Sequence, residues 1–219
     1  YGSTDYHWRI DSTINKILKL KPDMVVCAGD MIAGQSNNLT EKQITDMWRG
    51  FETYIYKPLT DAGIEFGFTF GNHDASFDLD KLLAKDYWTE EENIPDINYI
   101  DKVYYPFYYS FTTKDKNIFF VTLNAAGAFI NEKQLFWLEE NLKSDAARNA
   151  KYRIVVGHLP LFSLREKYDN KFNVINHHKE LLELFEKYDV KTYISGHHGV
   201  YFLGKKNGTD LLCGGEMGT

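Results

Sequence analysis

Cysteine, positive charge and long apolar runs are all scarce in this sequence. Two cysteines allow at most one disulfide, which excludes a disulfide-built miniature fold and a cysteine-rich zinc module and leaves the redox compartment open. No apolar run reaches the roughly 18 residues of a membrane-spanning helix. The 25 Lys and Arg residues are outnumbered by 31 Asp and Glu, which gives a net charge of −6. This acidic balance excludes a protein that binds nucleic acid mainly through a basic surface.

The sequence does contain enough apolar surface for a folded core. Over 219 residues, 43% of the side chains are hydrophobic and 16% are aromatic, a composition that excludes a disordered chain. This length suits one sizeable core, so we expect a single domain over residues 1–219, with Trp48 and Trp88 inside that core. Because the chain starts abruptly at Tyr1 and stops in a glycine-rich stretch, we expect it to be a fragment of a longer precursor.

Helix and strand signals alternate along the chain. Ser12 is predicted to cap a first helix. Thr40 and Gln43 form a capping box for a second helix, which Pro58 is predicted to kink or end. Residues 90–106 are polar and then rich in tyrosine, and they are predicted to form a long loop. The aromatic side chains of this region either pack against the fold or stack on a nucleobase, and packing is the more frequent outcome.

Four short apolar runs share one design, because each leads into glycine and then into a side chain of a type that binds metals. They cover residues 24–30, 68–74, 154–158 and 193–197. Strands that are apolar on both faces lie at the centre of a sheet, and their carboxyl ends meet at one crevice. We therefore expect four side chains to converge there: Asp30, Asn72, His158 and His197. One carboxylate, one amide and two imidazoles suit Mn, Fe or Zn, and suit Ca poorly because Ca prefers oxygen ligands only.

Taken singly, each of these strand endings is no more than a turn signal, but all four in this order favour a shared metal site. In four segments the chain resembles the calcineurin-like metallophosphoesterase superfamily: Gly29-Asp30, Gly71-Asn72-His73-Asp74, Gly157-His158 and Gly196-His197. The pattern of that family is D-x-H followed by G-D, G-N-H-[DE], G-H and G-H-x-H. The resemblance extends from about residue 21 to about residue 213.

The resemblance implies an α/β fold, a four-layer α-β-β-α sandwich of two mixed β-sheets. It also implies a centre of two divalent metal ions about 4 Å apart, in which Asp30 matches the bridging carboxylate. The remaining ligands of the second metal match three residues: Asn72, His158 and His197. His73 matches the histidine that stabilises the transition state or protonates the leaving oxygen, and Asp74 matches the acidic residue that orients it.

Two departures from the family pattern bear on the first metal. Gly199 stands where the family has a ligating histidine, and His198 at the intervening position is expected not to ligate. The letters of D-x-H occur at Asp5 and His7, but the apolar strand that normally precedes this motif is absent there. We favour the alternative that the motif and the first strand of the fold lie upstream of Tyr1. This chain then holds the ligands of one metal, which can still polarise a phosphoryl oxygen.

These patterns predict a metal-dependent phosphoric ester hydrolase, in which a metal-activated hydroxide attacks the phosphorus of a mono- or diester. The substrate is then a small molecule or a protein, and three loops are expected to select it: residues 35–38, 86–109 and 161–176. A second hypothesis is a catalytically impaired or non-catalytic binding module on the same fold, with one metal or none. The identity of the metal, the oligomeric state and the compartment stay open.

Overall fold

The computed structural model describes residues 4, 6 and 8–217 of the chain. Its α-helices are α1 (Trp8–Leu20), α2 (Glu41–Phe51), α3 (Lys57–Thr60), α4 (Asn72–Ala75), α5 (Asp78–Thr89), α6 (Glu132–Leu142), α7 (Asp145–Asn149) and α8 (His178–Lys187). Its strands are β1 (Met24–Cys27), β2 (Glu65–Phe68), β3 (Asn98–Asp101), β4 (Ser110–Thr112), β5 (Ile118–Thr122), β6 (Tyr152–Val156), β7 (Thr192–Ser195), β8 (Phe202–Lys206) and β9 (Thr209–Cys213). Shorter helical turns span Glu52–Tyr56, Glu91–Asn93 and Glu166–Tyr168.

The strands form two sheets. The smaller sheet is the parallel pair β1 and β2, with Val25 opposite Phe66. The larger sheet has seven strands in the order β3-β4-β5-β6-β7-β9-β8. Its central strands β5, β6, β7 and β9 run parallel, whereas β4 and β8 join antiparallel at the two sides. The larger sheet is thus mixed as predicted, and among the described residues the smaller one is purely parallel.

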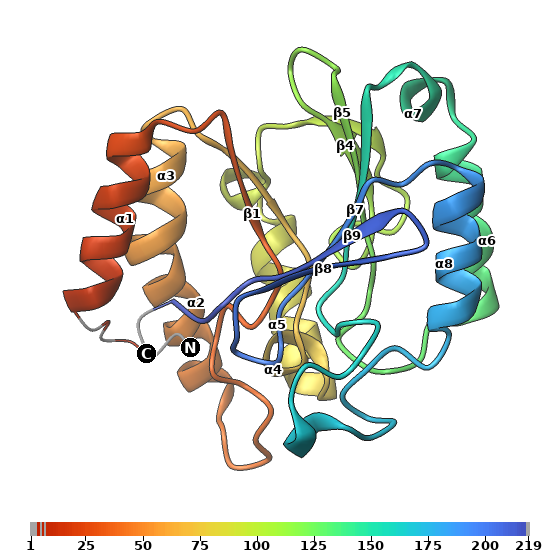
Figure 1. Cartoon of the computed structure of the whole chain (residues 1–219). Coiled ribbons are helices and arrows are strands. Elements are labelled where there is room, and N and C mark those ends of the chain that lie inside the picture. The colour runs from red at the N-terminus through yellow and green to blue at the C-terminus, as the bar shows by residue number, and fades with distance from the viewer. Residues whose placement is uncertain (1–3, 5, 7, 218–219) are drawn as a thin grey trace.

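Helices cover the outer side of each sheet. Helices α1, α2 and α3 lie on the side of the smaller sheet, and α6 and α8 lie against the larger one (Figure 1). Side chains along β5 point alternately to the two faces of the larger sheet. Phe120 packs into the core between the sheets, and Phe119 and Val121 pack into the core between this sheet and helices α6 and α8. The predicted α/β fold, with two sheets between layers of helices, is confirmed.

Local capping signals have mixed outcomes. The capping box at the start of α2 is confirmed, since Thr40 Oγ1 accepts from the Gln43 N–H and Gln43 Oε1 accepts from the Thr40 N–H. The predicted cap at Ser12 is wrong, because α1 begins at Trp8 and includes Ser12. Burial of Ile10, which is 6% exposed, explains the earlier start: an apolar contact ahead of the polar residue extends the helix.

The helix after the capping box does not end at Pro58. It passes from α-helical to π-helical geometry just before this proline. Residues Glu52–Tyr56 form a π-helical turn, and Pro58 lies in the first turn of α3, which follows directly. Proline has no N–H to donate, and its ring conflicts with the carbonyl four residues earlier. The wider π turn accommodates both effects, so the chain remains helical to Thr60.

The prediction of a continuous loop over residues 90–106 is wrong. Asn98–Asp101 forms β3, which pairs antiparallel with β4 at the edge of the larger sheet. Only one face of this edge strand is covered, and its exposed positions carry Asn98 and Ile100. A short strand with so little apolar alternation cannot be distinguished from a loop by its sequence.

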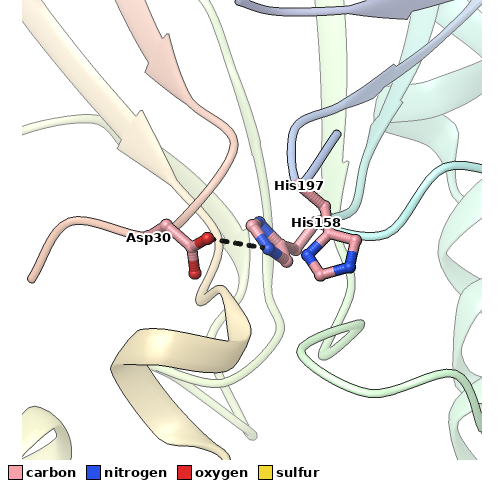
Figure 2. A group of neighbouring side chains, drawn as sticks. All are labelled: Asp30, His158 and His197. Atoms are coloured by element: carbon pink, nitrogen blue, oxygen red, sulfur yellow. Dashed lines mark ion pairs between the residues drawn. The ribbon is translucent and has the colours of Figure 1, made fainter. Parts of the chain in front are cut away.

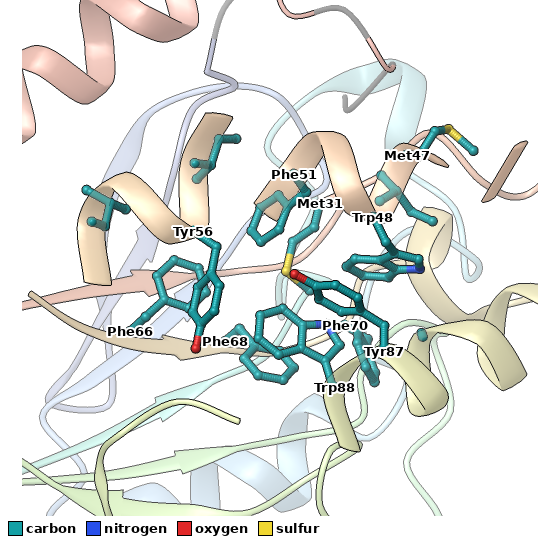
Figure 3. Close-up of a cluster of buried hydrophobic side chains, with 14 of the residues drawn as sticks. Met31, Met47, Trp48, Phe51, Tyr56, Phe66, Phe68, Phe70, Tyr87 and Trp88 are labelled. Atoms are coloured by element: carbon teal, nitrogen blue, oxygen red, sulfur yellow. The ribbon is translucent and has the colours of Figure 1, made fainter. Parts of the chain in front are cut away.

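Aromatic side chains fill the core beside the smaller sheet (Figure 3). The positions predicted for Trp48 and Trp88 are confirmed, since they are 1% and 0% exposed. Trp88 stacks on Phe68 with ring centroids 3.9 Å apart. The tyrosine-rich region packs against the fold, because Tyr105 and Tyr109 lie in or against the same core. This placement favours packing over the alternative of a nucleobase platform.

Candidate metal centre

Four segments that follow β-strands bring the predicted ligands together. Asp30 follows β1, Asn72 begins α4 after β2, His158 follows β6 and His197 follows β7. Figure 2 shows Asp30, His158 and His197 gathered at one point between the sheets. One ligand atom from each of these three residues lies within 4.8 Å of the others. The cluster therefore occupies the carboxyl ends of parallel strands, where α/β folds place their ligands.

The ring of His158 lies at the centre of the cluster and is 1% exposed. Its Nδ1 donates to the carbonyl oxygen of Ala28 at 2.7 Å, which leaves Nε2 with a lone pair. Nε2 faces Asn72 Oδ1 at 2.9 Å and Asp30 Oδ2 at 3.3 Å. Three atoms that carry lone pairs thus converge without a hydrogen between them. Only a cation or an added proton on Nε2 makes this arrangement favourable.

The charges of these groups follow from burial and from one another. Burial disfavours the charged form of His158, but the hydrogen bond and the charge of Asp30 outweigh burial and raise the pKa of His158. Burial likewise opposes ionisation of Asp30, and the bond with His158 overcomes it and lowers the pKa of Asp30. Burial first, and repulsion from His158 second, lower the pKa of His197 to about 4. His197 is therefore neutral at neutral pH, which is the form that binds metals.

The strand ends approach this closely because two positions lack a side chain. A Cβ at Gly29, where φ is +93°, would lie 2.4 Å from the backbone N of Gly71. A Cβ at Gly71 would lie 2.1 Å from Asp30 Oδ1. Asp30 and His197 themselves have φ values of 56° and 65°. Such conformations are uncommon for residues other than glycine and gather at functional sites, where the surrounding structure enforces them.

Side-chain amides from two loops contact a side-chain nitrogen of each of two candidate ligands. Asn72 Nδ2 donates to Gln35 Oε1 at 2.8 Å, and His197 Nε2 lies 2.9 Å from Asn173 Oδ1. Sequence reasoning placed Gln35 and Asn173 only in loops expected to select the substrate and did not identify them as site residues. No motif spacing marks either residue, because their positions depend on how the two loops fold back over the strand ends.

His73 lies in α4 next to the cluster. Its backbone N–H donates to Asp30 Oδ1 at 3.0 Å, and its ring Nδ1 lies 3.3 Å from the carbonyl oxygen of Gly34. The ring is partly exposed. The ring of His73 therefore lies beside the cluster with part of its surface open to solvent.

Asp74 is fully buried, with 0% of its surface exposed. Its carboxylate accepts from three backbone N–H groups, those of Met31 at 2.8 Å, Ile32 at 3.0 Å and Gly71 at 2.8 Å. Burial and the charge of Asp30 raise the pKa of Asp74 to about 7 despite these bonds. Both oxygens are thus used to tie the segments around Asp30 and Asn72 together. The predicted role of Asp74, to orient the His73 ring, stays a prediction.

The two departures from the family pattern have different outcomes. Gly199 has φ +62°, and a Cβ there would lie 2.2 Å from Glu216 Oε1, so a histidine at this position would require Glu216 to move and would strain the backbone. The ring of His198 points into the neighbouring loop, where it contacts the backbone of Leu164 and Asn173. Asp5 and His7, the residues with the letters of D-x-H, lie outside the described residues.

The family model of the calcineurin-like phosphoesterases matches residues 3–201. This chain belongs to the calcineurin-like phosphoesterase family. The resemblance noted in the sequence is thereby confirmed, and with it the broad class of a metal-using phosphoesterase. A search of curated proteins finds no match for this chain. Among the helices of residues 8–217, none combines the length and the hydrophobicity that a membrane span requires.

Solved structures share this fold at low sequence identity. Purple acid phosphatase PPD1 from yellow lupin (Lupinus luteus) seeds is 18% identical with a TM-score of 0.66, and the match covers 93% of this chain but 38% of the plant protein. GAP50, the anchor in the inner membrane complex of Plasmodium, is 18% identical with a TM-score of 0.60, covering 96% of this chain and 68% of GAP50. TT1561 of Thermus thermophilus is 8% identical with a TM-score of 0.52, covering 96% of this chain and 84% of that protein.

Proposed function

We propose that this calcineurin-like phosphoesterase hydrolyses phosphoric mono- or diesters with a divalent metal held by four residues: Asp30, Asn72, His158 and His197. The observation that carries the proposal is the convergence of Asp30 Oδ2 and Asn72 Oδ1 on His158 Nε2, with His197 beside them. The donor set of one carboxylate, one amide oxygen and two imidazoles suits Mn, Fe or Zn. When bound, such an ion supplies a Lewis acid for a phosphoryl oxygen and lowers the pKa of water.

The residues of the chain have separate tasks in this proposal. Asp30 and His158 would both hold the metal, and Asp30 also anchors His73 by accepting from the backbone N–H of that residue. Water attacks phosphorus and releases one proton to the solvent, while the bond from phosphorus to the leaving oxygen breaks. The ring of His73 is placed to donate a proton to that oxygen, so the alcohol leaves neutral.

Removal and return of metal tests the proposal directly. The whole chain is dialysed against EDTA and assayed with 4-nitrophenyl phosphate and with bis(4-nitrophenyl) phosphate. We expect hydrolysis to fall to background and to return when Mn²⁺, Fe²⁺ or Zn²⁺ is added, with metal content measured by mass spectrometry. Metal that binds without restoring hydrolysis of either ester, or hydrolysis that survives complete removal of metal, would contradict the proposal.

We expect the affinity for metal to fall as the pH falls. Metal and proton compete for His158 Nε2, and Asp30 raises the pKa of this ring. Below that pKa, binding must release the proton, so the apparent affinity falls by up to about tenfold per pH unit. For the metal-free protein the sign is opposite: the raised pKa stabilises the fold at low pH, and this stabilisation is lost as the pH rises through that pKa. Calorimetric titration with Zn²⁺ at a series of pH values, in two buffers of different ionisation enthalpy, measures the affinity and the number of protons released. An affinity for Zn²⁺ that does not change with pH would contradict the prediction.

Gly199 favours a second candidate function, a binding module that has lost catalysis. The position carries no ligating side chain, and the carboxylate of Glu216 occupies the space beside it. GAP50, which has a similar fold, is described as an anchor, and this description is a reason to test such a role. A single bound metal with no turnover of either ester would support this second candidate.

A further inference from the structure

The loop after β6 folds over the end of β7 and contacts two consecutive histidines there. This loop, residues 161–176, is the teal segment at the bottom of Figure 1. His197 is a candidate metal ligand, whereas His198 is 0% exposed and directs its ring into the loop. Both rings follow β7 in the chain and contact residues of the loop. Together they connect the loop to the end of the strand.

Every polar atom of the His198 ring is used by the loop. Its Nδ1 accepts from the Leu164 N–H at 3.2 Å, so this nitrogen carries no proton. Its Nε2 then carries the proton and donates to the backbone carbonyl of Asn173 at 3.1 Å. The ring stacks on Tyr168 with centroids 4.7 Å apart, and the carbonyl oxygen of His198 accepts from Arg165 Nη1 at 3.1 Å. A neutral, fully bonded ring of this kind is a structural anchor and not a metal ligand.

The anchored loop places one side chain against His197. Asn173 Oδ1 lies 2.9 Å from His197 Nε2, and Asn173 is the same residue whose backbone His198 holds. An amide oxygen can only accept, so Nε2 of His197 must carry the proton of the neutral ring. The lone pair of His197 is then on Nδ1. A histidine that binds metal usually donates its other nitrogen in this way, which fixes both its tautomer and its orientation.

We propose that Asn173 is a positioning residue that sets the tautomer and ring orientation of His197, and that His198 acts through Asn173 by anchoring its backbone. This inference rests on the proposed function, because it takes His197 as a ligand of the metal. It adds two residues from outside the predicted ligand set, and it gives the non-ligating histidine of the Gly-His-His-Gly sequence a defined task.

The test compares metal affinity in Asn173→Ala, Asn173→Asp and the exposed control Asn176→Ala. Calorimetric titration of the whole chain with Zn²⁺ is expected to show an affinity about 10- to 100-fold weaker in Asn173→Ala, the range for loss of an outer partner of a ligand. Asn173→Asp keeps an oxygen acceptor and should recover most of the affinity. Asn176→Ala should match the unchanged protein. His198→Ala should also weaken the affinity for Zn²⁺. If this variant fails to fold, the Asn173 variants alone test the proposal.

A second readout reports the tautomer without any metal. In ¹⁵N-labelled, metal-free protein, long-range ¹⁵N–¹H spectra should show His197 protonated at Nε2, and Asn173→Ala should yield a mixture of tautomers. Failure of the unchanged protein to bind Zn²⁺ would overturn the proposed function. Binding in the unchanged protein with equal affinity in Asn173→Ala and Asn176→Ala would overturn this inference alone.

Discussion

Replacing His158 by alanine is expected to abolish metal-dependent hydrolysis of phosphoesters. The ring lies between Asp30 and Asn72, and its Nε2 is the nitrogen at which the lone pairs converge. A bound metal stabilises the charge of the transition state by several kcal/mol, and each ~1.4 kcal/mol is a factor of ten in rate. Loss of the central ligand should therefore lower kcat/KM by about a thousandfold or more. The measurement is hydrolysis of 4-nitrophenyl esters together with the metal content of each protein.

The matched control for this variant is His177→Ala, which removes a histidine near the start of α8. His177 pairs with Glu180 and lies outside the cluster, so its removal should leave kcat/KM and metal content unchanged. Circular dichroism of both variants shows whether the fold survives. Metal-dependent turnover in a folded His158→Ala protein would contradict the assignment of His158 as the central ligand.

Features of this structure can be predicted from the sequence when the residues that form them lie close together in the chain. The capping box of Thr40 and Gln43 is formed by near neighbours in the chain, so its pattern is complete within one turn. The strands before Asp30 and His158 are also local signals, because an apolar run followed by glycine describes both the buried strand and its end. The convergence of those ends then follows from the general rule for parallel sheets.

Features that depend on long-range contacts were missed. The edge strand β3 exists because β4 offers it a partner, and its own alternation is too weak to reveal it. Asn173 lies 24 residues before His197 in the chain, so no local pattern indicates the contact of its side chain with His197 or that of its carbonyl with His198. Asp74 illustrates the same limit, because two of the backbone N–H groups that it binds belong to Met31 and Ile32, far away in the chain, and no sequence pattern indicates these contacts.

Trp88→Ala is expected to lower the stability of the fold strongly without removing any group of the metal centre. The indole is 0% exposed, stacks on Phe68 at 3.9 Å and meets the edge of Tyr56 at 5.3 Å (Figure 3). Removing a buried aromatic ring costs about 3–5 kcal/mol, because apolar contacts are lost and a cavity remains. Urea denaturation should therefore show a lower midpoint with little change in slope. The exposed aromatic residue Phe136, at 66%, provides the control, and Phe136→Ala should change stability by less than about 0.5 kcal/mol.

The same ring allows a sharper comparison, because Trp88 Nε1 is buried and makes no hydrogen bond among the described residues. A buried donor without an acceptor costs about 1–3 kcal/mol. Trp88→Phe keeps an aromatic ring against Phe68 and removes that donor, so its loss of stability should be clearly smaller than that of Trp88→Ala. Equal losses in the two variants would show that the full indole shape, and not the aromatic contact with Phe68, determines the stability of this core.

Because β2 ends at Phe68 and the chain then leads to Asn72, we expect metal binding to be weaker in Trp88→Ala than in Trp88→Phe.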